Sequence, residues 1–331
     1  MATLTSDRKG KKMSNDPELP LITVVGASGK QGRSVVDSLA RSGRYRVRAL
    51  ARRLDTALAQ QWRDAGVDVR SVGIQPGMER DLAAALRGSY GAFLMTPNLV
   101  PPADYEFALG REQADAALAA GVQHVVFSSL ENVEKRTAGR KLVPHFTSKA
   151  LVEEYIRGLP ITSSFVYMAF FYSNIMEFFP PASKGDGLKF SLYLPHHARQ
   201  PFVDPMTATG PAVVEIFAHP QQYAGASLPI IGEILSGDDM AATFERVTGI
   251  RTVYEPAYTS ESFVRTFPAF GANEHLTREL IGMAEYAVEY GYYAEDRDIA
   301  WSRQVDPQAL TWEQFLIRHK WRGAQTTFGS G

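Results

Sequence analysis

The sequence predicts an α/β protein, in which a doubly wound parallel sheet of the Rossmann type is followed by a smaller α+β domain. Short β-rich runs alternate with helical periodicity from residue 20 to residue 168, which is the pattern of parallel βαβ units. The first run ends in a glycine-rich turn that leads into a helix. After residue 168 the alternation stops, and crowded aromatic segments such as MAFFYSNIMEFFPP follow.

Six strands are expected in the first part, each a short run rich in β-branched and apolar residues. They are Leu21–Gly26, Tyr45–Ala51, Val67–Val72, Ala92–Thr96, His124–Ser128 and Ile161–Tyr167. The helix after the first strand places Val35, Val36, Leu39 and Ala40 on one face, as the period of 3.6 residues requires. Ligands of such sheets bind at the carboxyl ends of the strands, so a site is expected at that edge.

Three parts of the chain are expected from these patterns. Residues 1–19 are polar and of mixed charge, which predicts a disordered tail; its basic run RKGKK (8–12) is read as solvated tail, with a nuclear address as the alternative. Residues 20–160 form the predicted nucleotide-binding domain. Residues 161–331 form mainly a substrate or partner domain, packed directly on the first because no low-complexity linker separates them.

The composition excludes several classes of function. The 331 residues include no cysteine, which excludes disulfides, thiolate catalysis and cysteine-ligated metal. The net charge of -1 provides no basic field for nucleic acid or anionic lipid, and no apolar run reaches the roughly 18–20 residues that span a bilayer. No metal site is expected, since His196 and His197 lack matching ligands. The predicted location is the cytoplasm, with the nucleus as an alternative.

The glycine-rich turn GASGKQG predicts a dinucleotide site. Gly26, Gly29 and Gly32 lie between a strand and a helix, the context that this type of motif requires. Gly26 permits the tight turn, Gly29 lets the backbone approach a pyrophosphate, and Gly32 lets the helix pack closely on the sheet. The helix N-terminus then offers free N–H groups and the positive end of its dipole to the phosphates.

The end of the second predicted strand indicates which dinucleotide binds. An NAD site normally has an acid there, which accepts a hydrogen bond from the ribose 2′-hydroxyl. Here the strand runs into Arg52 and Arg53, and the first acid is Asp55. A guanidinium binds a 2′-phosphate through charge-assisted hydrogen bonds, so NADP(H) is favoured, with Arg52 as the better candidate. The alternative is a solvated basic turn.

From residue 20 onward the chain resembles the NmrA-like proteins, which are atypical short-chain dehydrogenase/reductases. The resemblance is carried by GASGKQG, VVFSSLENVEKRTAGR (125–140), HFTSKALVEEYIRGL (145–159), SSFVYMAFFYSNIMEFF (163–179) and EDRDIAWSRQVDPQALTWEQFLIRHK (295–320). The family includes an animal sensor of NADPH that shifts between monomer and dimer, and fungal oxidoreductases of secondary metabolism. The resemblance implies a nicotinamide cofactor in the cleft between the two domains.

The resemblance also implies which residues bind that cofactor. The turn from Gly26 to Gly32 would hold the pyrophosphate, Arg52 the 2′-phosphate, Thr96 the ribose, and Lys149 with 171–174 the nicotinamide end. One departure from the family pattern is SVGIQPG after the third strand, where Gly-Asp is common near the adenine and Gln75 would substitute. The complete set is Gly26, Ala27, Ser28, Gly29, Lys30, Gln31, Gly32, Arg52, Arg53, Gln75, Thr96, Lys149, Phe171, Tyr172, Ser173 and Asn174.

The segment HFTSK decides which catalytic groups the chain has. In the superfamily's Tyr-x-x-x-Lys motif the tyrosine donates a proton and the lysine holds the ribose; here His145 occupies the tyrosine position and Lys149 remains. Ser128 and Ser129 stand where the superfamily's serine lies. Lys149 is expected either to act as a general acid with a depressed pKa or to bind ribose without chemistry. His145 is interpreted as structural, with catalysis as the weaker alternative.

Two functions follow from these observations. The first is an NADPH-dependent reductase of a small hydrophobic, aromatic or polyketide-like substrate, consistent with the apolar segment FVYMAFFYSNIMEFF. The second is a non-catalytic NADP(H) sensor that acts through a regulatory protein partner or a change to a homodimer. Neither function involves direct binding of nucleic acid or membrane.

Overall fold

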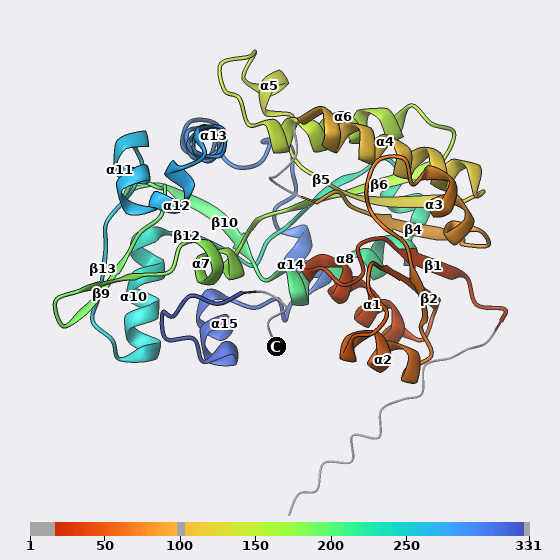
Figure 1. The fold of residues 1–331 in the computed structure, drawn as a ribbon, viewed down its shortest axis with the longest axis horizontal. Helices are drawn as coiled ribbons and strands as arrows, with labels where there is room; N and C mark the ends of the chain where they lie inside the picture. Colours follow the sequence, from red (N-terminus) through yellow and green to blue (C-terminus); the bar gives the residue numbers. More distant parts are fainter. Residues whose placement is uncertain (1–16, 98–102, 328–331) are drawn as a thin grey trace, which may run out of the picture.

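A computed structural model of the chain describes residues 17–97 and 103–327. Its largest element is a seven-stranded parallel sheet with the strand order β11-β6-β5-β4-β1-β2-β3, seen on the right of Figure 1. The strands in chain order are β1 (Leu21–Val24), β2 (Arg46–Ala51), β3 (Asp68–Ser71), β4 (Gly91–Leu94), β5 (His124–Ser129), β6 (Thr162–Met168) and β11 (Ser227–Ile230).

Helices cover both faces of this sheet (Figure 1). The lower layer in that view contains α1 (Lys30–Ser42), α2 (Ala57–Asp64) and α8 (Pro205–Ala218), and the upper layer contains α3 (Glu79–Leu86), α4 (Ala103–Ala119) and α6 (Pro144–Arg157). Two apolar cores result because side chains alternate across a strand. In β5, Val126 faces the core of α1 and α8, whereas Val125 and Phe127 belong to the core on the opposite face.

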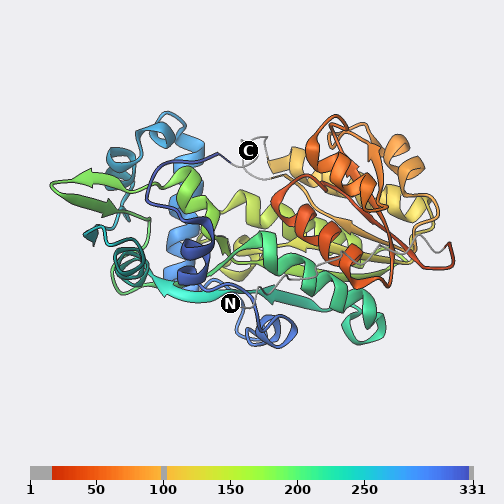
Figure 2. The same cartoon turned by 90° about the horizontal axis from the view of Figure 1, so that it is seen from below.

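The second part of the molecule lies beside the carboxyl edge of the large sheet and contains two small sheets (Figure 2). One has the order β12-β10-β7 and the other β13-β9-β8. Its strands are β7 (Phe170–Phe171), β8 (Ala182–Lys184), β9 (Gly187–Phe190), β10 (Arg199–Val203), β12 (Glu233–Ser236) and β13 (Thr252–Tyr254). Its main helices are α7 (Tyr172–Phe178), α10 (Gly237–Thr248), α11 (Ser260–Thr266), α12 (Pro268–Gly271), α13 (Glu274–Tyr290) and α15 (Trp312–His319).

Three short helices complete the described chain. They are α5 (Val133–Arg136), α9 (Pro220–Tyr223) and α14 (Trp301–Val305). Local sequence explains several helix ends: Ser236 and Asp239 form a reciprocal capping box at the start of α10, which satisfies two otherwise free backbone donors. No helix in the described ranges combines the length and apolarity that crossing a membrane would need.

The predicted fold class is confirmed, and each of the six predicted strands lies within two residues of an observed one at both ends. The first strand ends at Val24 rather than Gly26 because Gly26 adopts a positive φ of 68° and already belongs to the turn. The predicted tail lies outside the described residues up to residue 16.

The division of the chain at residues 160 and 161 does not coincide with the division between the sheets. β6 pairs with β5 in the large sheet, and β11 pairs with β6 in parallel, with Ser227 opposite Phe165. α8 packs against α1, where the backbone N–H of Gly210 donates to Ser34 Oγ at 2.8 Å. Two segments of the second half therefore return to complete the first layer.

Candidate functional site

The glycine-rich turn lies between β1 and α1 and is held to the sheet by its own backbone. The N–H of Ala27 donates to Leu50 O at 3.0 Å. A Cβ on Gly32 would lie 2.2 Å from Gly26 O, so only glycine lets α1 start this close to the strand. A Cβ on Gly29 would meet just one backbone oxygen within 4 Å, at 3.3 Å. Apart from this one close contact, no protein atom beyond the neighbouring residues lies within 4 Å of that position.

The N-terminus of α1 has the features of an anion site. Gly29 is its N-cap and makes no side-chain capping bond, and the first turn contains no acid. The first backbone N–H groups of a helix have no partner inside the helix, and the dipole favours negative charge there. Since Ser28 is exposed beside this turn, the residues predicted to hold a pyrophosphate are present in a geometry that suits one.

The two arginines after β2 differ in their surroundings. Both are exposed, but Arg53 is paired with Asp55 at 3.2 Å. The Arg52 side chain makes no hydrogen bond or ion pair with any residue in the described ranges, although Arg52 O accepts from Ser71 Oγ. Gln75, the predicted adenine contact, is exposed and borders a separate small hollow with Gly73.

A cavity of about 410 Å³, here called the cleft cavity, lies between the carboxyl ends of the central strands and the second part. Most of its wall is apolar, with Phe170, Phe171, Phe178, Phe179, Phe270, Leu276, Leu280 and Met283 among the lining residues. Its polar lining comprises Lys30, Gln31, Thr96, Ser128, Ser129, His145, Lys149, Asn174, Glu177 and Tyr292. Such a volume with few polar groups is typical of a small-molecule site.

Lys149 is buried, and its ammonium group is fully hydrogen-bonded within the protein. Its ammonium donates to Thr96 O at 3.2 Å and to Thr96 Oγ1 at 2.8 Å, and it forms an ion pair with Glu106 of α4. Thr96 Oγ1 donates in turn to Glu106 Oε1 at 2.6 Å. An ammonium has three donors, so all three are used inside the protein. Lys149 must release one of these partners before it can hold a ribose hydroxyl.

His145 also lines the cavity and has a buried carboxylate as its partner. Its ring Nδ1 and its backbone N–H are each 2.6 Å from Glu279 Oε1 of α13. The side chains of His145 and Glu279 are 8% and 5% exposed, respectively. Burial raises the pKa of Glu279, but the hydrogen bond and charge of His145 outweigh it and hold the pKa below its ordinary value. Glu279 is therefore ionised at neutral pH.

Two polar contacts join the glycine-rich turn to other parts of the cavity. Ser128 Oγ donates to Gln31 Oε1 at 2.8 Å, which connects α1 with the end of β5. Lys30 is paired with Glu177 of α7 at 2.7 Å, with both side chains nearly buried. Ser129 is turned into the structure, where its hydroxyl lies 3.4 Å from Lys149 O. The turn is thus connected to both walls of the cavity.

The segment 171–174 divides between the cavity and the core. Phe171 and Asn174 line the cavity, but the lining includes neither Tyr172 nor Ser173. Tyr172 is completely buried and packs on Phe202, Trp312 and Phe315. The start of α7 therefore turns the Tyr172 ring into the aromatic core and away from the cavity lining, which differs from the expected position beside the cofactor.

Sequence reasoning did not identify three acids at this site, Glu106, Glu177 and Glu279. Each lies on a helix and meets its partner from a distant part of the chain, 43 residues away for Lys149 and 134 residues away for His145. Nothing in their local sequence separates them from surface acids on an amphipathic helix. The only signal available was indirect, since a buried lysine or histidine requires a partner.

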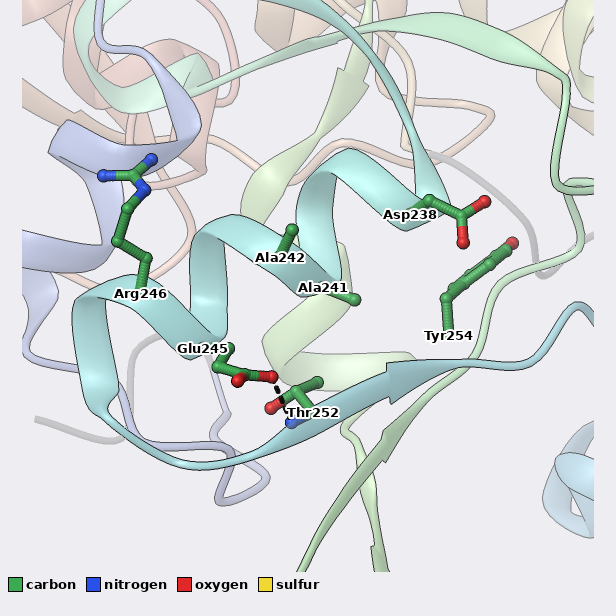
Figure 3. A pocket seen from close by; sticks show the side chains of 7 residues that line it. All are labelled: Asp238, Ala241, Ala242, Glu245, Arg246, Thr252 and Tyr254. Carbon is green, nitrogen blue, oxygen red and sulfur yellow. Dashed lines mark hydrogen bonds between the residues drawn. The ribbon is translucent and has the colours of Figure 1, made fainter.

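A second hollow lies far from the cleft, between α10 and β13. Figure 3 shows residues of α10 around this hollow together with Thr252 and Tyr254 of β13; Glu245 accepts from the backbone N–H of Thr252 at 2.8 Å. Arg246 points away from β13 and is paired with Glu313 of α15. His196 borders this region, because its Nδ1 lies 3.0 Å from Asp238.

The comparisons with known proteins agree with this fold. A sequence model of the NmrA-like family matches residues 19–316. The chain is 30% identical over 260 residues to the NmrA-like family domain-containing oxidoreductase FrzB of Cladobotryum sp, a match that covers 72% of this chain and 77% of that protein.

Two solved structures share the fold. NmrA, a negative transcriptional regulator solved with NAD and with NADP, has a TM-score of 0.69 and 22% identity, covering 90% of this chain and 94% of that chain. The NADPH-dependent quinone oxidoreductase QOR2 of Escherichia coli, solved with NADPH, has a TM-score of 0.69 and 18% identity, covering 90% and 99%. With the family model matching most of its length, this chain belongs to the NmrA-like family.

Proposed function

We propose that this chain is an oxidoreductase that uses a nicotinamide dinucleotide, preferably NADPH, to reduce a small hydrophobic acceptor. The observation that carries the proposal is the extent of the cleft cavity. Its lining runs from Lys30 and Gln31 of the glycine-rich turn to the apolar wall of Leu276 and Leu280 on α13. A dinucleotide on the turn and an apolar substrate against α13 would therefore share one space.

The residues of the turn suit the dinucleotide. The uncapped N-terminus of α1 and the space over Gly29 suit a pyrophosphate. Arg52 is exposed at the end of β2 with no protein partner in the described ranges, which suits a 2′-phosphate. When bound, the dinucleotide would supply a hydride. FrzB is named an oxidoreductase, and NmrA and QOR2 were solved with NAD, NADP or NADPH, which supports the same reading.

The role that we assign to Lys149 is to bind the ribose of the nicotinamide rather than to donate a proton. Its three donors are already used by Thr96 and Glu106. A ribose hydroxyl can replace a neutral threonine oxygen with little change in charge, whereas proton transfer would leave Glu106 buried without its counter-ion, at a cost of several kcal/mol.

A second candidate, an NADP(H) sensor, is favoured by one contact. Lys30 at the start of α1 is paired with Glu177 of α7. A pyrophosphate at the N-terminus of α1 competes with Glu177 for this ammonium, so cofactor binding would release α7. NmrA, which shares this fold, is a negative transcriptional regulator, and a protein partner that recognises the released α7 would give this chain a comparable role.

Turnover separates the two functions. The purified protein is mixed with NADPH and a panel of aryl ketones, quinones and enones, and loss of reduced nicotinamide is followed. The reductase predicts oxidation of NADPH that depends on one of these acceptors. NADPH that binds without any acceptor-dependent oxidation, together with a change in oligomer size, would favour the sensor.

A further inference from the structure

We propose that His145 is the proton donor for reduction of a carbonyl group in the cleft cavity, and that Glu279 of α13 is the residue that positions it. This inference rests on the proposed function and names the acid of that reaction. It starts from the one histidine in the cavity lining and its buried carboxylate partner.

The hydrogen bonds determine which ring nitrogen of His145 carries a proton. An ionised carboxylate accepts hydrogen bonds and cannot donate them. Since Glu279 is ionised and its Oε1 lies 2.6 Å from Nδ1, Nδ1 must carry a hydrogen in both the neutral and the charged ring. Nε2 is then the nitrogen that gains and loses a proton.

Nε2 is also the nitrogen that a substrate can reach. It has no hydrogen-bond partner among the described residues, and it retains contact with solvent. Nδ1 is occupied by Glu279, while the residue lines the cavity. The titrating nitrogen of His145 is therefore the one with access to the cavity.

Glu279 places a negative charge beside the His145 ring, which stabilises the imidazolium. His145 is the second residue of α6, whose N-terminal dipole disfavours a cation. The carboxylate of Glu279 opposes that effect, since it lies within hydrogen-bond distance of the ring and accepts from the backbone N–H of His145 as well. A purely structural Glu279 would cap α6 in the same way, so the test must read out the charge of His145.

The proposed step balances in atoms and electrons. The carbonyl carbon accepts a hydride from the reduced nicotinamide, and the electron pair of the C=O π bond moves to the oxygen. That oxygen takes the proton from Nε2, which completes the alcohol. The substrate gains two electrons, the nicotinamide is oxidised, and His145 is left neutral with its Nδ1–H still donating to Glu279. A proton from solvent restores the imidazolium.

The apolar wall limits the substrate class. α13 holds Glu279 and also contributes Leu276, Leu280 and Met283 to the cavity lining. The same helix therefore positions the acid and provides the surface on which the substrate packs. An aryl or other apolar ketone, with its carbonyl as the one polar group, suits this arrangement.

Other titratable groups lie near His145 and Glu279, and each of them can also contribute to the pH dependence of the reaction. His275 on α13 is exposed and lies 3.8 Å from Glu279 Oε2. The other titratable groups of the cavity lining are Lys149, Lys30, Glu177 and Tyr292, and Glu106 lies behind them as the partner of Lys149. His275→Gln is thus a matched control, because it removes an exposed histidine from the same carboxylate.

The first experiment measures the pH dependence of acceptor reduction. His145→Gln should lower kcat by about 10²–10⁴-fold, the usual contribution of a positioned acid, with the Kd for NADPH unchanged within twofold. Glu279→Gln keeps a hydrogen-bond acceptor but removes the negative charge beside the ring, so the falling limb of kcat should move to lower pH. His275→Gln should leave both the rate and the limb in place. Circular dichroism and NADPH binding show whether each variant is folded.

The second experiment does not depend on turnover. Nitrogen-15 NMR of the imidazole rings, assigned with His145→Gln, should show neutral His145 with its hydrogen on Nδ1. A neutral ring protonated on Nε2, or acceptor turnover that His145→Gln leaves intact, would overturn the assignment of His145 while the reductase function stood. No acceptor-dependent NADPH oxidation by the unaltered protein would instead defeat the reductase and, with it, the donor role.

Discussion

Replacing Glu106 with glutamine should lower the stability of the protein and tighten its binding of NADPH. The Lys149 and Glu106 side chains are 7% and 6% exposed, so the pair is buried. Removing one member of a buried pair typically costs about 3–5 kcal/mol. Two bonds from Lys149 to Thr96 would remain, and the cavity gives the ammonium some access to water. We therefore expect a loss near the lower limit, about 3 kcal/mol.

The gain in affinity has the same cause. Thr96 and Glu106 together use all three donors of the Lys149 ammonium. The uncharged amide holds the ammonium less tightly, so the ammonium can turn from a Thr96 oxygen to the ribose at a lower cost. If about 1.4 kcal/mol of that interaction is released, the Kd for NADPH should fall about tenfold. Urea unfolding and calorimetric titration measure the two effects. Glu154→Gln is the control, since Glu154 pairs with Lys135 at the surface and its loss should cost at most about 1 kcal/mol. Unchanged stability, or weaker NADPH binding in a folded Glu106→Gln protein, would refute the reasoning.

Three further predictions test other parts of the site and fold. Arg52→Glu should weaken the binding of NADPH about 10- to 100-fold and leave the binding of NADH nearly unchanged, since one charge-assisted contact contributes about 1.5–3 kcal/mol. In Arg53→Glu, which removes an arginine that is already paired, calorimetry should show a smaller loss of NADPH affinity; equal losses in the two variants would contradict this. Gly29→Val should abolish cofactor binding in a protein that still folds cooperatively, because its Cβ makes one close contact, with a backbone oxygen at 3.3 Å; normal binding would show that the turn is only structural. Burial lowers the pKa of His124 from 6.5 to about 4, and its ring Nδ1 has no partner, so protonation favours the unfolded state. Between pH 6.5 and about 4, urea unfolding should show a loss of about 3 kcal/mol as the pH falls, and His124→Asn should remove that part of the slope.

The elements that local sequence controls could be predicted, and the pairings between distant residues could not. The strands of the large sheet are visible as apolar runs, and the glycines of the first turn have a local steric reason. Glu106 and Glu279 become functional only through partners brought close by the fold. Their helices show the same polar pattern that a solvent-facing acid would have, so periodicity cannot distinguish the two cases.

Two differences between the sequence-based expectations and the structure have specific physical causes. Tyr172 follows Phe171 at the junction of β7 and α7, where neighbouring side chains point in different directions. Phe171 faces the cavity and Tyr172 faces the core, a choice that depends on the tertiary position of α7. Likewise β11 is a four-residue strand, and no local signal shows that it pairs with β6 rather than with a strand of the second part.

The measurement that tests the central claim most directly is the oxidation of NADPH and of NADH by the purified protein with the panel of aryl ketones, quinones and enones. If the chain is a reductase that contacts the 2′-phosphate, oxidation should require both the protein and one of these acceptors, and kcat/KM should be higher for NADPH than for NADH. Tight NADPH binding with no oxidation by any ketone, quinone or enone of the panel would contradict the claim.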